Sequence, residues 1–387
     1  MAKASPLTVN GTIRVSRPVY AVPGGGTERP LDQWLGVVES LVRAGARELG
    51  CRAAMPTASF RKAAENLARL AQVRLSHDRL RAIVEAEGRA VLAATEAGVL
   101  GPAWTAADCR VTPGGPTGLM GGADGVKVPL VTAAEKQKRR ARRRRRHKAR
   151  RGKRCRRAAT PRHPGSDGRW KEFKIGVFYD VSGEHQYAIG TAGNHDVLGR
   201  RMRREAAKVR LGEAQQRVAV SDGADWIQYQ LRTRLPMVQV RILDWYHLMQ
   251  HVAAAAVVCF GEGSEAAKAW RTRLSEAAKT EGAAGLLVAV HETRRSMRSA
   301  AKREALRRLE QYVAKRAEML DYPTFLKEGF DIGSGPTEAF CKTLTSRLKG
   351  SGMRWDRPNA EAMMALAALG HSHLWEAYWT RQRRNAA

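Results

Sequence analysis

Three carboxylate residues, far apart in the sequence, are of the type that could share divalent metal ions. Asp124 lies in "GGADGVKVPL", Asp222 in "RVAVSDGADW" and Glu338 in "IGSGPTEAF". Converging carboxylates repel each other unless a cation joins them, and Mg²⁺ binds a few carboxylates while keeping several waters. Two such ions, about 3.5–4 Å apart, can activate a water or a 3′-hydroxyl and stabilise the leaving oxygen of a phosphodiester. The residue types therefore favour metal-dependent phosphodiester chemistry if the fold brings them together.

Each acid also has an ordinary structural interpretation. Asp-Gly is a turn dipeptide, so Asp124 and Asp222 could each begin a turn, and Asp225 could cap the helix that follows. Glu338 could simply favour a helix N-terminus. Asp180, in "FYDV" at a predicted strand end, is a rival for the first carboxylate.

The phrase "DWYHLMQH" adds a second group of polar residues at a predicted strand-to-helix junction. Asp244 lies three residues before His247, and His247 and His251 are four apart, hence on one helix face. A zinc protease of this pattern needs Glu after the first His; Leu248 stands there and excludes that chemistry. We interpret His251 as structural and leave Asp244 and His247 open between a structural and a functional role.

Apolar alternation and turn residues predict the elements that position these side chains. Strands are expected at 122–131, 170–181 and 186–193, then a helix at about 195–211, a strand before Asp222, a helix from Trp226, and a strand running into a helix around "MVQVRILDWYH". This is the order of the RNase H-like fold, in which an antiparallel meander is extended by parallel strands. The glycines in "GLMGGA" weaken strand character, so we expect the first strand to be short.

The segments on either side of this α/β pattern are predicted to be helical. Residues 261 to 320 show helical periodicity alone, which predicts an insertion. Ser334 and Pro336 suit the start of the helix that carries Glu338, and a final helix is expected at about 358–380. Near the N-terminus, an irregular arm at 1–30 precedes a helix with apolar residues between Leu31 and Val42.

Two further helices, at about 61–71 and 76–87, are joined by "VRLS", with Ser76 as the expected N-cap. This pattern fits a helix-turn-helix, whose second helix would enter a DNA major groove. An ordinary helical hairpin fits it equally well. The Gly- and Pro-rich residues 101–120 indicate a boundary.

The net charge points to a polyanionic partner. The formal charge is +31, and sixteen of the positive residues lie in "KQKRRARRRRRHKARRGKRCRR", residues 136–157. Nucleic acid is the simplest such partner. A membrane surface is the weaker alternative, because the sequence has no apolar stretch of about 18 residues and no lipidation motif.

Cysteine usage and the N-terminus indicate a cytoplasmic protein. The five cysteines are widely and irregularly spaced, with no C-x-x-C pair. Such spacing argues against a Cys-type zinc site and against a disulfide framework. The N-terminus has no apolar region of a secretory signal.

Taken together, the motifs resemble bacterial insertion-sequence transposases of the DDE type, in the ISKra-type group related to Mutator-like transposases. The matching phrases are "ADGVKVPLV", "EKQKRR", "WKEFKIGVFYD", "DGADWI", "LDWYH", "YPTFLKEGFDIGSGPTEAFCK" and "RLKGSGMRW". They cover about residues 120 to 370, and their combination and order are specific. The N-terminal helices are similar to that group's DNA-binding region more loosely.

The resemblance implies an RNase H-like catalytic domain with a helical insertion before the last acid, and Mg²⁺- or Mn²⁺-dependent cleavage and strand transfer at transposon ends. Asp124, Asp222 and Glu338 match the three metal-binding acids. Asp244 and His247 match the D-x-x-H signature of the Mutator-like group, in which the His lies near the active site. Double-stranded DNA is the implied partner, with a homo-oligomer assembled on it.

We therefore expect an arm at 1–30, a helical DNA-binding region at 31–115, and a catalytic domain at 120–260 and 329–375. The catalytic domain would contain a basic loop at 132–169, a helical insertion would occupy 261–328, and a tail 376–387. The residues expected to contact DNA are Arg142, Arg143, Arg144, Arg145, Arg146, Lys148, Arg150, Arg151, Lys349 and Arg354. The alternative function is a catalytically inactive nucleic-acid-binding protein derived from such an enzyme.

Overall fold

The computed structural model describes residues 2–35, 41–150, 170–350 and 353–384 of the 387-residue chain. Its centre is a five-stranded sheet with the spatial order β11-β10-β7-β8-β9. The strands are β7 (Gly118–Pro129), β8 (Trp170–Tyr179), β9 (Gln186–Thr191), β10 (Gln216–Ser221) and β11 (Val240–Leu243). β7, β8 and β9 pair antiparallel, whereas β10 is parallel to both β7 and β11. The mixed α/β class is thus confirmed.

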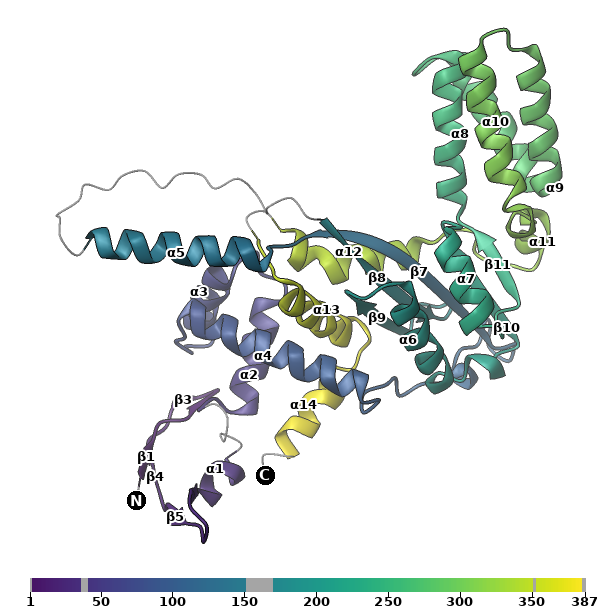
Figure 1. The fold of residues 1–387 in the computed structure, drawn as a ribbon. Helices are drawn as coiled ribbons and strands as arrows, with labels where there is room; N and C mark the ends of the chain where they lie inside the picture. Colours follow the sequence, from purple (N-terminus) through teal and green to yellow (C-terminus); the bar gives the residue numbers. More distant parts are fainter. Residues whose placement is uncertain (1, 36–40, 151–169, 351–352, 385–387) are drawn as a thin grey trace.

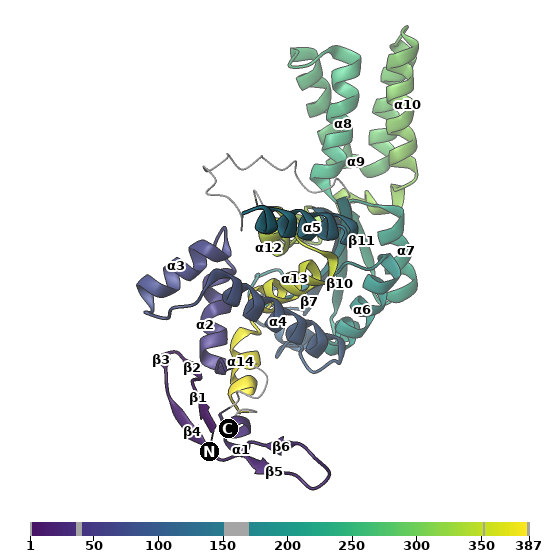
Figure 2. The same cartoon turned by 60° about the vertical axis from the view of Figure 1, so that its left-hand side comes forward.

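Helices cover both faces of this sheet (Figures 1 and 2). α6 (His195–Lys208) lies on one face with α7 (Asp225–Arg234) beside it, and Met202 of α6 packs against Gly176. α12 (Gly335–Lys349) and α13 (Arg357–His371) lie on the other face, where Thr337 reaches Gly122 and Met364 reaches Gly190. Glycines in the strands allow these close helix approaches.

A helical arm projects from the β11 end of the sheet (Figure 1). It consists of α8 (Trp245–Phe260), α9 (Glu265–Ser296) and α10 (Ala300–Ala314), which pack against one another. α9 is broken at Gly282, whose φ of 66° favours glycine. The short α11 (Tyr322–Lys327) follows the arm. The predicted insertion began at residue 261, whereas α8, sixteen residues long, already lies with the arm.

Three small two-stranded sheets occupy the N-terminal residues for which an irregular arm was expected. Their strands are β1 (Ala2–Ala4), β2 (Leu7–Thr8), β3 (Gly11–Thr12), β4 (Val15–Arg17), β5 (Tyr20–Ala21) and β6 (Thr27–Glu28). α1 (Pro30–Trp34) and α2 (Ala44–Ala54) follow in place of one long helix. Residues 36–40 lie outside the described chain.

The predicted helix pair at 61–87 is present, but its second helix is longer than expected. α3 (Phe60–Leu70) and α4 (His77–Glu96) are separated by a short turn. The Ser76 hydroxyl accepts a hydrogen bond from the backbone N–H of Arg79 at 3.2 Å, as expected of an N-cap. The extra turns of α4 are stabilised by packing on α13, where Gly88 lies against the backbone of Ala362.

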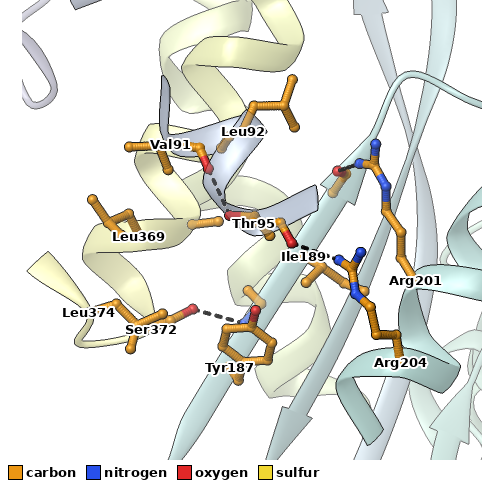
Figure 3. A pocket seen from close by; sticks show the side chains of 14 residues that line it. Val91, Leu92, Thr95, Tyr187, Ile189, Arg201, Arg204, Leu369, Ser372 and Leu374 are labelled. Carbon is orange, nitrogen blue, oxygen red and sulfur yellow. Dashed lines mark hydrogen bonds between the residues drawn. The ribbon is translucent and has the colours of Figure 1, made fainter. Parts of the chain in front are cut away.

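A cavity with a largely apolar lining marks the joint between α4 and the sheet domain (Figure 3). Val91, Ile189 and Leu369 line it from three different elements. At its rim Arg204 donates to the carbonyls of Thr95 and Glu96 at 2.9 and 2.7 Å. The guanidinium of Arg204 is thus already paired with backbone carbonyls, and we assign the cavity a packing role.

Two predictions about single elements are wrong. β7 is not short: it has twelve residues and is paired along both edges, with β8 and with β10. The last predicted helix is two helices, α13 and α14 (Trp375–Arg384), separated by a turn in which His373 has a φ of 55°. The expected start of α12 is confirmed: Ser334 is its N-cap residue and Pro336 lies in its first turn, although the Ser334 side chain makes no capping hydrogen bond.

Within the described ranges, no helix combines the length and apolar character that crossing a membrane requires.

Candidate metal centre

The register of the central strands places Asp124 and Asp222 side by side. Val220 of β10 is paired in parallel with Gly122 of β7. Continuing that register by two residues puts Asp222, just past the end of β10, opposite Asp124. Neighbouring residues in register point to the same face of a sheet. Because Gly122 on that face lies against Thr337, the face is the one covered by the first turn of α12.

Glu338 stands next to Thr337 in this first turn and is exposed. The thiol of Cys341, one turn further along α12, is buried and lies within interaction range of both Glu338 and Asp124. Burial raises the pKa of Cys341, and the negative charge of Asp124 raises it further. α12 therefore links the third acid to the first through a side chain that the sequence interpretation overlooked. Its spacing, three residues after Glu338, puts it on the same helix face.

Asp124 is held in surroundings that disfavour its negative charge. Burial raises the pKa of this carboxyl, and the charges of Asp222 and Glu172 raise it further. Hydrogen bonds from the Gly125 amide and the Cys341 thiol oppose the rise only in part. Two adjacent carboxylates that repel each other fit a site that takes a metal ion.

The ligand atoms of the three acids do not lie close enough together to form a compact cluster. In the described part of the chain, the one group of three Cys, His, Asp or Glu residues with ligand atoms all within 4.8 Å is Cys109, Asp180 and His185. Asp124, Asp222 and Glu338 do not reach that spacing. Their ligand atoms therefore lie farther apart than those of Cys109, Asp180 and His185.

Residues directly after α10 of the arm bind the loop that carries Asp222. The Asp222 carboxylate accepts a hydrogen bond from the Ala224 amide at 2.8 Å, the turn expected of Asp-Gly. Arg316 donates to the Gly223 carbonyl at 3.1 Å, and Lys315 pairs with Asp225 at 2.7 Å. Asp225 is therefore an ion-pair partner, and Ala224 is the N-cap residue of α7. Residues after α10 thus fix the position of the second acid.

Asp244 has a structural role that the structure makes explicit. Its carboxylate is 1% exposed and accepts hydrogen bonds from the backbone N–H groups of His247 at 2.6 Å and Ser334 at 2.5 Å. It therefore caps α8 and also ties the residue before α12 to the start of the arm. With both oxygens engaged by backbone amides, Asp244 supports the site.

His247 is half-buried in the first turn of α8, close to two other aromatic rings. Its ring centroid lies 5.1 Å from that of His251 and 6.5 Å from that of Tyr312. His251 stacks on Tyr312 with centroids 3.9 Å apart, which agrees with its structural interpretation. Burial lowers the pKa of His251, as do His247 and Arg316.

Asp180, the rival for the first acid, lies elsewhere. It follows β8 directly, whereas Asp124 pairs with Ile175, five residues earlier. At about 3.3 Å per residue this is roughly 16 Å along the strand. Asp180 organises the β8–β9 turn instead, and Asp124 alone lies beside Asp222.

The basic run begins as a helix directly after the strand that carries Asp124. α5 (Ala133–Arg150) projects from the body of the molecule (Figure 1). Arg142, Arg144 and Arg145 are exposed on it, and Lys136 at its base is paired with Asp356. Arg143, Arg146, Lys148 and Arg150 belong to the same helix, and Arg151 lies outside the described residues. Lys349 is exposed at the end of α12, and Arg354 is half-buried.

No protein-family profile matches the chain, and no curated protein is significantly similar to it.

Proposed function

We propose that the chain is a DNA transposase of the DDE type, with an RNase H-like catalytic domain and a metal centre formed by Asp124, Asp222 and Glu338. The observation that carries the proposal is the strand register that sets Asp222 beside Asp124 on the face under the first turn of α12. Three acids from a central strand, the next parallel strand and a late helix are what phosphodiester cleavage by two metal ions needs.

The strand order supports the RNase H-like assignment. An antiparallel meander of β7, β8 and β9 is extended on the β7 side by the parallel strands β10 and β11. The helical arm enters between β11 and α12, ahead of Glu338. This is the position at which the resemblance places an insertion.

Mg²⁺ or Mn²⁺ fits the donor set, because all three side chains offer hard oxygen ligands and the charge of Asp222 disfavours the charged form of Asp124. The bound ions would activate the attacking water or 3′-hydroxyl and stabilise the leaving oxygen. The residues of the chain then have separate tasks. The acids would hold the ions, Asp244 keeps the starts of α8 and α12 together, and His247 would lie near the scissile phosphate.

DNA binding would come from two basic surfaces of different kinds. The first turn of α4 exposes His77, Arg79 and Arg81, in the position of a recognition helix that reads base edges. The arginines of α5, with Lys349 and Arg354, would contact phosphates and contribute affinity without sequence preference. Two transposon ends must be joined, so we expect a homo-oligomer on DNA.

Cleavage of duplex DNA carrying the terminal repeats, with Mg²⁺, tests the proposal. We expect Asp222→Asn and Glu338→Gln to bind this DNA as the parent does. Nicking should fall by more than about 100-fold, since changes in groups that merely support a metal ligand already cost about 10–100-fold.

Glu265→Gln is the control, because Glu265 begins α9 at the end of the arm away from the three acids and its side chain is 89% exposed. It should cut normally. An Asp222→Asn protein that cuts as well as the parent would refute the metal centre. A parent that binds DNA but never cuts it would favour the inactive binding protein instead.

A further inference from the structure

A second group of metal-ligand side chains lies away from the three acids. Cys109 follows a short 3-10 turn at Ala106–Asp108, Asp180 follows β8, and His185 precedes β9. One ligand atom from each lies within 4.8 Å of the others, a spacing no other such trio reaches among the described residues. Asp180 is roughly 16 Å along the sheet from the level of Asp124. The trio is therefore separate from the proposed catalytic centre.

The three side chains are more buried than those of an ordinary cluster of polar residues on a protein surface. Cys109 is 0% exposed and Asp180 3% exposed, while the His185 side chain is 25% exposed. The Trp104 ring lies 5.4 Å from the His185 ring. The three residues join two chain segments, because Cys109 precedes β7 and the other two belong to the β8–β9 hairpin.

Hydrogen bonds organise the hairpin turn that carries Asp180 and His185. One oxygen of Asp180 accepts from the Ser182 hydroxyl at 2.6 Å and contacts His185 Nδ1 at 2.9 Å, and the other accepts from the His185 amide at 3.1 Å. These bonds account for Asp180 and His185 but do not involve Cys109. The Cys109 thiol has only a long contact, 3.5 Å, to the Thr105 carbonyl.

The surroundings of the Cys109 thiol are negative. Burial, together with the carboxylates of Asp180 and Asp108, raises the pKa of Cys109 to about 12. Asp108 also lies within electrostatic range of His185. A buried sulfur atom beside two carboxylates and an imidazole lacks a positive partner, and a divalent cation would supply one.

We propose that Cys109, Asp180 and His185 bind one Zn²⁺ ion, which ties the segment before β7 to the β8–β9 hairpin. Zn²⁺ takes sulfur, nitrogen and oxygen ligands in tetrahedral sites, whereas Mg²⁺ prefers oxygen alone. Asp108 or a water would complete four ligands. On binding, the thiol turns from the Thr105 carbonyl, releases its proton to solvent and binds the metal as thiolate.

Cobalt substitution tests this site without DNA and independently of cleavage. The full-length protein, stripped with chelator and kept reduced, is titrated with Co²⁺ and then with Zn²⁺. We expect a thiolate-to-Co²⁺ charge-transfer band that saturates at about one equivalent and is displaced by Zn²⁺. Zn²⁺ should also raise the melting temperature of the protein.

Variants assign the band to the proposed ligands. Cys109→Ser should lose both the band and the Zn²⁺ effect on melting, whereas Cys259→Ser, at an equally buried cysteine outside the group, should keep them. If Cys109→Ser does not fold, His185→Asn serves, because the backbone bond from residue 185 to Asp180 remains. It should weaken Co²⁺ binding by at least about tenfold. Absence of the band in the parent, or its persistence in Cys109→Ser or at full strength in His185→Asn, would overturn the proposal.

Discussion

At the scale of single residues, Asp124 shows how a functional group can oppose stability. Its pKa is raised in the folded protein, first by burial and then by Asp222. The folded state therefore holds the proton more tightly than the unfolded chain does. The stability contributed by the protonated carboxyl is present below the unfolded pKa, about 4, and is lost as the pH rises through the folded pKa.

Asp124→Asn should accordingly melt at a higher temperature than the parent at pH 7 without added metal, because the amide carries no charge. The difference should shrink as the pH falls towards 4. Asp225→Asn should change the stability in the opposite direction, because a hydrogen bond from Lys315 lowers the pKa of Asp225. That variant should lose stability at neutral pH relative to acid pH. Thermal melts across this range would refute the assignment if both variants changed in the same direction.

Arg347 is a second residue whose charge is poorly compensated. Its guanidinium is 4% exposed, donates to the Thr57 carbonyl and lies 4.6 Å from the Phe60 ring centroid. Its Nε and Nη2 atoms have no hydrogen-bond partner. Burial lowers the pKa of Arg347 to about 10.

Replacing a buried charge by an apolar side chain of similar length is often stabilising, by about 1–4 kcal/mol. We expect Arg347→Met to raise the melting temperature by a few degrees, at about 2–4 °C per kcal/mol. Arg347→Lys, which keeps the charge and loses the planar fork, is the matched comparison and should melt below the parent. A lower melting temperature for Arg347→Met would mean that the contacts to Thr57 and Phe60 outweigh the cost of burying the charge.

At the scale of elements, the glycines of β7 separate what the sequence could predict from what it could not. The apolar strands around 175, 188, 218 and 242 were found because their side chains alternate or form short apolar runs. Gly121 and Gly122 carry no such signal, so β7 was expected to be short. Gly122 lets α12 pack closely on β7, and such a tertiary contact cannot be predicted from a local sequence pattern.

This crossing gives a sharp mutational test. A Cβ atom at residue 122 would lie 1.9 Å from the Thr337 hydroxyl, whereas one at residue 121 would meet its nearest neighbour, on Phe178, at 3.8 Å. Gly122→Ala should therefore destabilise the protein by about 1–3 kcal/mol and displace Glu338, with loss of cleavage. Gly121→Ala should be close to neutral. Adding Thr337→Ala to Gly122→Ala should restore part of the stability in denaturant unfolding.

The candidate sites show the same limit on sequence-based prediction. Asp222, Glu338, Asp244 and His247 belong to phrases with strong local character, and their helices and strands were placed within a few residues. Cys341 lay one turn from Glu338 and could have been found by its spacing. Cys109 lies near His185 only in the folded chain, where the turn after β8 meets the segment before β7. The hydrogen bond from Arg316 to Gly223 likewise forms between residues that are far apart in the sequence. Contacts of this kind depend on the packed fold.

At the scale of the whole molecule, positive charge is concentrated on one projecting element. If α5 contacts phosphates, each neutralised phosphate releases counterions, and log K should fall with log salt by about 0.9 per contact. Replacing Arg142, Arg144 and Arg145 by Gln should reduce the slope by up to about 3 units and weaken binding to all DNA sequences alike.

Replacing Lys268, Arg271 and Arg303 of the arm by Gln changes the net charge by the same amount away from α5 and serves as the control. Fluorescence anisotropy between low and moderate salt measures both slopes. Equal slopes for the two triple variants would show that α5 has no special role and that only the overall charge matters.

α8 has one end at the proposed centre and the other near the tip of the arm. Its sixteen residues span about 24 Å at 1.5 Å per residue. A rotation of about 5° at Asp244 would thus displace the Phe260 end by roughly 2 Å. Because Asp244 binds both the start of α8 and the residue before α12, the pivot of α8 lies beside the proposed metal centre. A force on the far end of the arm would therefore act on the start of α12, which carries Glu338.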